Sequence, residues 1–281
     1  MNSSRTYLTF DIGATNTRMI LWDGDTVVTQ EKYATPVSDQ QGIHTLLTKA
    51  KAILEGRLPS GIGIGVCGQV KDGSIDGVPP NLPYWENTPI QSVVAETFGG
   101  SEILVAQDGI CSAWAEGELQ PAGKTYLLSI GTGVGGAFID TSVSPWYTIA
   151  AEPGHMIVDM RTDEHIGLTA GSLTEYLAGG KAEHMYGRSF DLFTEKSPEW
   201  ELFAYAAACG ISTIASLFNP DRVILSGGVI ERQNHLLAKI ISSFQDTLQI
   251  FDADRIRISL SNIPSDIIVG QGLATMLRQL Q

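Results

Sequence analysis

Two segments of the chain share one unusual pattern. Residues 9–22, TFDIGATNTRMILW, and residues 125–140, TYLLSIGTGVGGAFID, each run from an apolar strand-like segment through a turn of small residues into a second strand. After each of them, strand-like and helix-like apolar spacings alternate. This repeat of architecture predicts an α/β protein with two similar halves, about 1–118 and 119–266, and a last helix over 267–281 that can return to the first half.

The remaining segments fit this scheme, because 281 residues are enough for one large domain or two ordinary ones. Three strands are expected over 6–34, with turns at 13–17 and 23–25, and further strands over 61–70, 102–108, 222–228 and 255–260. Helices are expected over 39–56, 90–98, 109–119, about 200–218, about 234–248 and about 267–280.

Composition excludes several classes of function. Hydrophobic residues make up 43% and charged residues 17%, which is typical of a globular chain with a core. The net charge of −13 argues against nucleic acid or an anionic membrane as a partner, because no basic stripe is present to neutralise phosphates. The N-terminus lacks an apolar signal segment and no stretch of transmembrane length is expected, so a cytoplasmic location is predicted. The three cysteines are far apart, which favours neither a zinc site nor a disulfide framework.

The two small-residue turns are candidate phosphate sites. GTGVGG (131–136) formally fits a G-x-G-x-x-G fingerprint, but a strand follows it where a dinucleotide site needs a helix. Glycine allows the backbone to approach a phosphate, and threonine hydroxyls add donors. One such turn can be a simple hairpin, whereas two at matching places suggest a phosphate chain held between them. Asp11, at the end of the first strand, could then hold Mg²⁺ through water.

Other polar residues each have a functional and a structural reading. Asp108 follows a buried strand and precedes a helix, so it is either a helix N-cap or a general base at a carboxyl strand end. Glu152 and His155 are joined by a rigid Pro-Gly turn and could bind hydroxyl groups, although a lone histidine can also be structural. Glu175 can be a solvated helix residue. The glycine pair in ILSGGVI (224–230) is either a plain strand–helix turn or a nucleoside contact.

With these motifs in order, the chain resembles the sugar kinases of the ROK family and the related bacterial glucokinases, within the actin/hexokinase/heat-shock-70 superfamily. DIGATNTR (11–18) resembles the first phosphate motif, GTGVGG the second, and SGGV (226–229) the adenosine motif. PNLPYW (80–85) resembles the P-N-L-x-x-W signature of the sugar domain, and AEPGHM (151–156) resembles the G-E-x-G-H sugar loop. The resemblance runs from Asp11 to about Gly272.

The resemblance implies an actin-like ATPase fold, with two ribonuclease-H-like α/β halves around a nucleotide cleft. It also implies an enzyme that transfers phosphate from ATP, with Mg²⁺, to the primary hydroxyl of a hexose or N-acetylhexosamine, with Asp108 as the general base. The implied sugar-binding residues are Asn81, Leu82, Gln107, Glu152, His155 and Glu175. The implied nucleotide-binding residues are Asp11, Gly13, Ala14, Thr15, Asn16, Thr17, Gly131, Thr132, Gly133, Gly227 and Gly228, with Asp11 also serving Mg²⁺.

The sequence departs from the family pattern at three points. The segment after His155 lacks the cysteines of the usual zinc site, so no structural zinc is expected. Gln107 stands where the family usually has asparagine before the catalytic aspartate, and Gly109 follows it, which leaves the identity of the sugar open. No helix-turn-helix is expected at the N-terminus, which disfavours the repressor branch of the family. The alternative to a kinase is a sugar- or nucleotide-sensing protein of the same fold without activity, and the resemblance leaves a homodimer open.

Overall fold

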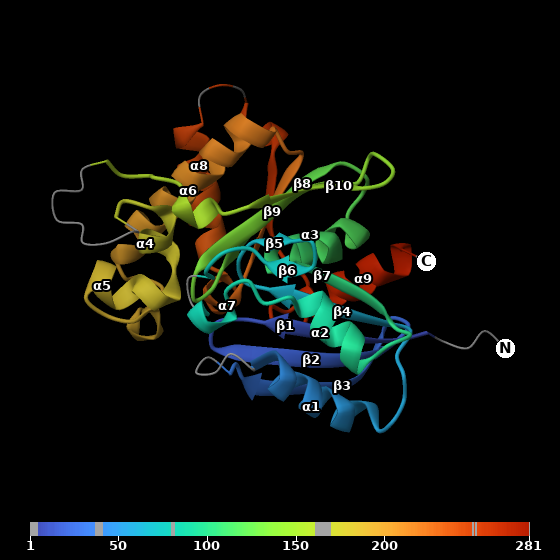
Figure 1. Cartoon of the computed structure of the whole chain (residues 1–281). Helices are drawn as coiled ribbons and strands as arrows, with labels where there is room; N and C mark the ends of the chain where they lie inside the picture. The colour runs from blue at the N-terminus through green and yellow to red at the C-terminus, as the bar shows by residue number, and fades with distance from the viewer. Residues whose placement is uncertain are drawn as a thin grey trace. The chain divides into compact units, whose positions relative to one another are not determined.

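The computed structural model describes residues 5–36, 42–79, 82–160, 170–248, 250 and 252–280. The chain divides into two compact units, each with its own core (Figure 1). Unit 1 comprises Met1–Glu118 together with Asp266–Gln281, and unit 2 comprises Leu119–Ser265.

Unit 1 is built on a five-stranded sheet in the order β3-β2-β1-β4-β7. Its first three strands form an antiparallel meander, and β4 and β7 then continue the sheet parallel to β1. The strands are β1 (Thr6–Ile12), β2 (Asn16–Asp23), β3 (Thr26–Ala34), β4 (Gly61–Val66) and β7 (Glu102–Gln107). A separate small hairpin consists of β5 (Val70–Lys71) and β6 (Ser74–Ile75). The helices are α1 (Gly42–Leu54), α2 (Ile90–Thr97), α3 (Asp108–Leu119) and α9 (Ile268–Gln279).

Alternate glycines on β4 allow the C-terminal helix α9 to pack closely on the sheet of unit 1. A Cβ atom built on each of these glycines would lie 2.5–3.0 Å from a side chain of α9. The glycines are Gly61, Gly63 and Gly65, and the facing side chains are Leu277, Leu273 and Val269 respectively. Because side chains two apart on a strand share a face and residues four apart on a helix share a face, the two spacings match. The last helix therefore packs on the glycine-rich strand β4.

Unit 2 repeats the strand order of unit 1, with the sheet β10-β9-β8-β11-β12. Again three antiparallel strands are followed by two parallel ones. The strands are β8 (Lys124–Ile130), β9 (Val134–Asp140), β10 (Tyr147–Ala151), β11 (Arg222–Ser226) and β12 (Arg257–Leu260). The helices are α4 (Leu173–Leu177), α5 (Ala182–Tyr186), α6 (Glu199–Phe218), α7 (Gly228–Arg232) and α8 (Leu236–Thr247). The predicted two-fold repeat of an α/β architecture is confirmed.

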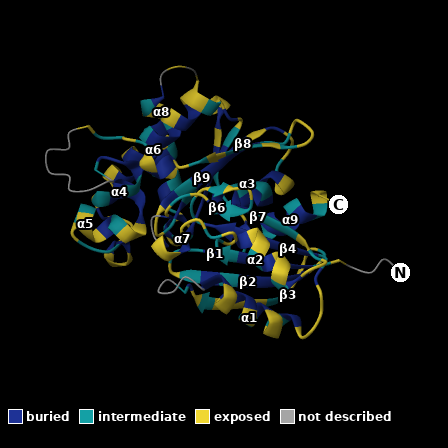
Figure 2. Ribbon diagram, in the orientation of Figure 1, coloured by how far each residue is buried: buried dark blue, intermediate teal, exposed yellow. Residues whose placement is uncertain are grey.

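The helix α6 forms the centre of the core of unit 2. Its residue Trp200 is fully buried and packs against Phe190, Phe193 and Phe203, with ring centroids 4.9–5.4 Å apart. The helix also packs against α4 and α8, and Figure 2 shows buried residues along it. By length and composition alone, α6 meets the criteria for a membrane-spanning helix, with half of its apolar window buried. The expectation that no stretch reaches transmembrane length was therefore wrong, and packing in this core explains why the helix is so apolar.

Other differences from the sequence-based expectation are local. The strand expected over 61–70 ends at Val66, and Val70 belongs to the separate hairpin. The edge strand β10 and the short helices α5 and α7 were not expected. Each of these elements spans only five residues, which is too short for its apolar spacing to be recognised.

Candidate active site

Two carboxylates of unit 1 lie at the carboxyl ends of parallel strands. Asp11 is near the end of β1, and Asp108 directly follows β7 as the first residue of α3. The strand between them is β4, where Gly65 is the register partner of Asp11 and Val66 is the partner of Gln107. Ligands of α/β proteins gather at this edge of a sheet. Because Gly65 has no side chain, α9 and Cys111 of α3 pack closely against it.

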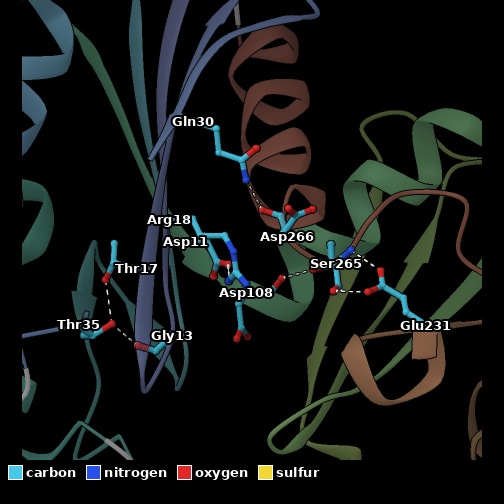
Figure 3. A network of polar contacts seen from close by, with 11 residues as sticks. Asp11, Gly13, Thr17, Arg18, Gln30, Thr35, Asp108, Glu231, Ser265 and Asp266 are labelled. Atoms are coloured by element: carbon cyan, nitrogen blue, oxygen red, sulfur yellow. Dashed lines mark hydrogen bonds and ion pairs between the residues drawn. The ribbon is translucent and has the colours of Figure 1, made fainter. Parts of the chain in front are cut away.

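Asp11 has a basic neighbour, Arg18. The two residues are register partners on β1 and β2, and Arg18 Nη1 lies 3.4 Å from Asp11 Oδ2 (Figure 3). Burial raises the pKa of Asp11 to about 6, because desolvation outweighs the attraction of the Arg18 guanidinium. At neutral pH the carboxylate is mostly ionised, as a ligand for a cation must be.

Asp108 is held at the start of α3. Its Oδ1 accepts a hydrogen bond from the Gly109 amide at 2.7 Å, and its carbonyl accepts one from the Ser112 hydroxyl at 2.9 Å. The side chain lies next to the Arg18–Asp11 pair in Figure 3. In agreement, burial first, and then the charges of Asp108 and Asp11, raise the pKa of the Cys111 thiol well above its usual value. Both carboxylates therefore lie near one buried side chain of α3.

The first glycine turn, residues 13–17, connects β1 to β2 and is fixed from a second direction by Thr35. The Gly13 amide donates to the Asn16 carbonyl at 3.1 Å, which closes the turn. Thr35 donates its hydroxyl to the Gly13 carbonyl at 2.7 Å and its amide to the Thr15 carbonyl at 3.0 Å. The Thr17 hydroxyl is buried and shares a 2.9 Å hydrogen bond with that of Thr35. Thr15 is the exposed hydroxyl of the turn, and Ala14 and Asn16 are half-buried. No pattern in the sequence indicates the role of Thr35, which lies just beyond β3.

In unit 2, the second glycine turn, residues 131–133, is exposed at its tip. The Gly131 amide donates to the Gly133 carbonyl at 2.9 Å, and Thr132 and Gly133 are exposed. A Cβ built on Gly131 or Gly133 would meet no atom within 4 Å. The open space beside these backbone groups fits a phosphate, which exposed amides and a threonine hydroxyl can bind.

A third glycine segment packs against this turn, and sequence reasoning did not identify it. Gly179 and Gly180 donate their amides to the carbonyls of Gly131 at 2.8 Å and Thr132 at 3.1 Å. Gly227 packs on the other side: its φ is 98°, and a Cβ there would lie 2.5 Å from the Ile130 carbonyl oxygen. Glycine is required at Gly227 for both reasons. Three glycine segments of unit 2 therefore meet backbone to backbone.

The SGGV segment leads directly into α7. Gly228 is the first residue of that helix, and a Cβ on Gly228 would lie 3.4 Å from Arg232 Nη1, one turn further along. The Arg232 guanidinium therefore lies beside the glycine pair, and it also forms a 3.7 Å ion pair with Asp191. The predicted nucleoside-binding backbone thus has a basic side chain beside it.

The EPGH loop, residues 152–155, is packed tightly against the start of β9. The His155 amide donates to the Glu152 carbonyl at 3.1 Å, and both side chains are exposed. A Cβ at Gly154 would overlap the Val134 carbonyl oxygen and the Thr174 hydroxyl. Burial, and then the charge of Glu152, raise the pKa of Tyr126 above its usual value, which places Glu152 near that ring. The loop therefore presents two polar side chains on a closely packed backbone.

Glu175 is buried rather than solvated. Its side chain is 3% exposed, Oε2 accepts a 2.6 Å hydrogen bond from the Gly171 amide, and Oε1 lies 3.6 Å from His184 Nε2. The reading of Glu175 as a solvated helix residue was therefore wrong. Its carboxylate stabilises the turn that precedes α4.

The PNLPYW segment is anchored in the core of unit 1. Trp85 donates its indole N–H to the Pro36 carbonyl at 2.9 Å, and its ring lies against Gly42. Leu82 is fully buried in the same core, so only its backbone is left for the substrate contact that was expected of it. Gln107, at the end of β7, is 4% exposed. Asn81 lies outside the described residues.

The sequence model of the ROK family matches residues 7–262. The chain belongs to the ROK family. Among curated ROK-like relatives, a fructokinase of Lactococcus lactis subsp. cremoris is 26% identical, with 79% of each chain covered. A ROK glucokinase of Streptomyces griseus, solved with glucose and AMPPNP, is 21% identical, with a TM-score of 0.73 and 98% of each chain covered. A ROK transcriptional regulator, homologous to the Escherichia coli MLC protein, is 17% identical with a TM-score of 0.79, covering 98% of this chain and 79% of the regulator.

These likenesses confirm the predicted fold class. The two units of this ROK protein have the actin-like ATPase fold of the solved structures. At 21% and 17% identity, these two solved structures show only that the fold is shared. The family contains both kinases and regulators. Within the described ranges, no group of three or more His, Cys, Asp or Glu residues could hold a metal ion. A cation that Asp11 binds would therefore need its other oxygen ligands from water and phosphate.

Proposed function

We propose that this protein is an ATP-dependent sugar kinase that phosphorylates the primary hydroxyl of a hexose or N-acetylhexosamine. The observation that carries this proposal is the pair of carboxylates at one edge of the sheet of unit 1. Asp11 is ion-paired with Arg18, and Asp108 is held at the start of α3 by the Gly109 amide. Two carboxylates in different environments are suited to different roles, because one can hold a cation while the other accepts a proton.

Asp108 is the proposed general base. Its carboxylate accepts the proton of the sugar hydroxyl as the hydroxyl oxygen attacks the terminal phosphate of ATP and ADP leaves. The hydrogen bond from the Gly109 amide fixes the position of the carboxylate. MgATP supplies the phosphoryl group and the cation that neutralises its charge. Asp11 would hold that cation through water. The backbone amides of the exposed residues Thr132 and Gly133 would bind phosphate oxygens, and the backbone of Gly227 and Gly228 would contact the nucleoside.

The sugar is assigned to the EPGH loop. Glu152 and His155 are exposed, and they flank Gly154, which packs so closely against Val134 and Thr174 that no side chain would fit there. Polar side chains on such a closely packed loop can distinguish sugars by their hydroxyl groups. The named relatives act on different sugars, fructose and glucose, which supports a hexose without choosing one. A cytoplasmic location and a homodimer stay predictions.

A second candidate is a sugar- or nucleotide-sensing protein that transfers nothing. The observation in its favour is the fold shared with the regulator. Retention of both Asp11 and Asp108 weighs against it, because a sensor needs no general base.

An assay of ADP release tests the proposal. The purified protein is incubated with MgATP and a panel containing glucose, fructose, mannose, allose, N-acetylglucosamine and N-acetylmannosamine. We expect release that depends on one or a few of these sugars and is lost in Asp108→Asn. Sugar binding without ADP release from any member of the panel would support the sensor instead.

A further inference from the structure

Lys181 follows the glycine segment that is bonded to the second glycine turn. Gly179 and Gly180 each donate an amide to that turn, to the carbonyls of Gly131 and Thr132 at 2.8 and 3.1 Å. The Lys181 amide in turn donates to the Ala178 carbonyl at 2.9 Å, which closes a short 3₁₀ helix over Gly179–Lys181. The backbone of Lys181 is therefore fixed relative to the turn.

The two glycines allow this close approach. A Cβ at Gly180 would lie 2.9 Å from the Thr132 carbonyl oxygen, and one at Gly179 would lie 3.2 Å from that of Gly131. Larger residues at either position would push the two segments apart. Lys181 thus provides the first long side chain after the contact, on a stem that is long enough to extend over the turn.

Lys181 carries a positive charge directly after the two glycines that bind the second glycine turn. Among the described residues, no hydrogen bond or ion pair involves its side chain, although the residue is half-buried. Three other basic side chains of the unit do have carboxylate partners: Arg188 with Glu199 at 2.7 Å, Arg232 with Asp191 at 3.7 Å, and Lys239 with Glu201. No described carboxylate therefore competes with an anionic ligand for the Lys181 ammonium.

We propose that Lys181 is a further nucleotide-binding residue, whose ammonium binds phosphate oxygens of the donor at the second glycine turn. This inference rests on the proposed function. The backbone amides of the exposed residues Thr132 and Gly133 would provide directional hydrogen bonds, and Lys181 would add a point charge for the phosphate chain. In a chain of net charge −13, a fixed local cation also offsets the repulsion that a polyphosphate would meet.

The variants Lys181→Met, Lys181→Gln and Lys181→Arg, together with Lys196→Met as a matched control, test this assignment. Lys196 is an exposed lysine of the same unit, outside the three glycine segments. Binding of MgATP and of adenosine is measured by titration calorimetry, and melting temperature is measured alongside. Adenosine carries no phosphate, so it separates a charge effect from damage to the nucleoside site.

We expect Lys181→Met to weaken MgATP binding by about 10- to 100-fold, with adenosine binding and melting temperature unchanged. Lys181→Arg should retain most of the affinity, and Lys196→Met should bind as the wild type does. Should methionine at this position lower the melting temperature, Lys181→Gln gives the same comparison. MgATP binding that is unchanged in both neutral variants, or adenosine binding that falls equally, would overturn the inference.

The assay separates this inference from the proposed function. Wild-type protein that binds MgATP in a Lys181-dependent manner but phosphorylates no sugar would contradict the kinase proposal alone. Full sugar phosphorylation with unchanged MgATP binding in Lys181→Met would contradict the role of Lys181 alone.

Discussion

Arg18 on β2 lies directly across from Asp11 on β1, with Nη1 3.4 Å from Oδ2. The attraction does not compensate for burial, because the pKa of Asp11 is raised from 3.8 to about 6. Ionisation of the Asp11 carboxyl therefore destabilises the folded protein. The proposed cation ligand is a destabilising residue in the absence of its ligand, as is common for functional sites.

The first prediction concerns the pH dependence of stability in the absence of Mg²⁺ and nucleotide. Because the folded state binds the Asp11 proton more tightly than the unfolded state does, its contribution to stability is lost as pH rises from about 4 through about 6. Asp11→Asn should raise the free energy of unfolding at pH 8 by up to about 3 kcal/mol, with little change at pH 3.5. Denaturant titrations at both pH values measure this. Asp23→Asn, at an exposed position of β2, is the control, and an equal gain at both pH values would contradict the prediction.

The second prediction concerns Asp108. Asparagine keeps an oxygen that can accept the hydrogen bond from Gly109 and is nearly isosteric, but it cannot take a proton. Asp108→Asn should therefore slow phosphoryl transfer by ~10²–10⁴-fold while melting temperature and ligand affinities stay near those of the wild type. Turnover on the best sugar is compared with calorimetric binding of that sugar and MgATP. Near-normal turnover in a stable variant would leave Asp108 as a helix-capping residue only.

The third prediction separates the sugar from the nucleotide. Glu152→Gln and His155→Ala change exposed side chains of the EPGH loop without changing Gly154, which packs against Val134. Each should weaken sugar binding by ~5- to 150-fold and leave MgATP binding within about two-fold. Separate titrations of the two ligands check this, and equal losses for both would place these residues outside the sugar site.

The fourth prediction concerns the packing of α9 on the sheet. In Gly63→Ala the new Cβ would lie 2.8 Å from Leu273 Cβ, so the helix or strand must shift. We expect a loss of about 1–3 kcal/mol in the free energy of unfolding. Gly99→Ala is the matched control, because a Cβ there would have its nearest neighbour at 3.6 Å. Equal stability of the two variants in urea titrations would show that α9 is not tightly seated on β4.

The fifth prediction concerns metals. The cysteine-free segment after His155 predicts no structural zinc, whereas the proposed reaction needs Mg²⁺. Chelation with EDTA should abolish ADP release and leave the melting temperature unchanged, and added Mg²⁺ should restore activity. Stoichiometric zinc in elemental analysis, with a lower melting temperature after its removal, would contradict the first half of this prediction.

The order of the elements and the two-fold repeat could be predicted from the amino-acid sequence alone. Strands such as those before Asp11 and Gly131 are long apolar segments bounded by small-residue turns, and these signals are local. The positions of Asp108 and of the EPGH loop were likewise predictable, because each is defined by its neighbours along the chain. Local patterns of this kind can be recognised in the sequence, since each depends on residues only a few positions apart.

The contacts between segments that are distant in the sequence became known only from the tertiary structure. Thr35 fixes the Gly13–Thr17 turn from 18 residues beyond Thr17, and Gly179 and Gly180 bind a turn nearly fifty residues earlier. The burial of Leu82 and Glu175 was equally hidden, because a leucine or glutamate in a loop or short helix has no periodicity that reveals its environment. The reason is physical: hydrogen bonds and packing between segments depend on distances in space, and the spacing of residues along the chain does not encode those distances.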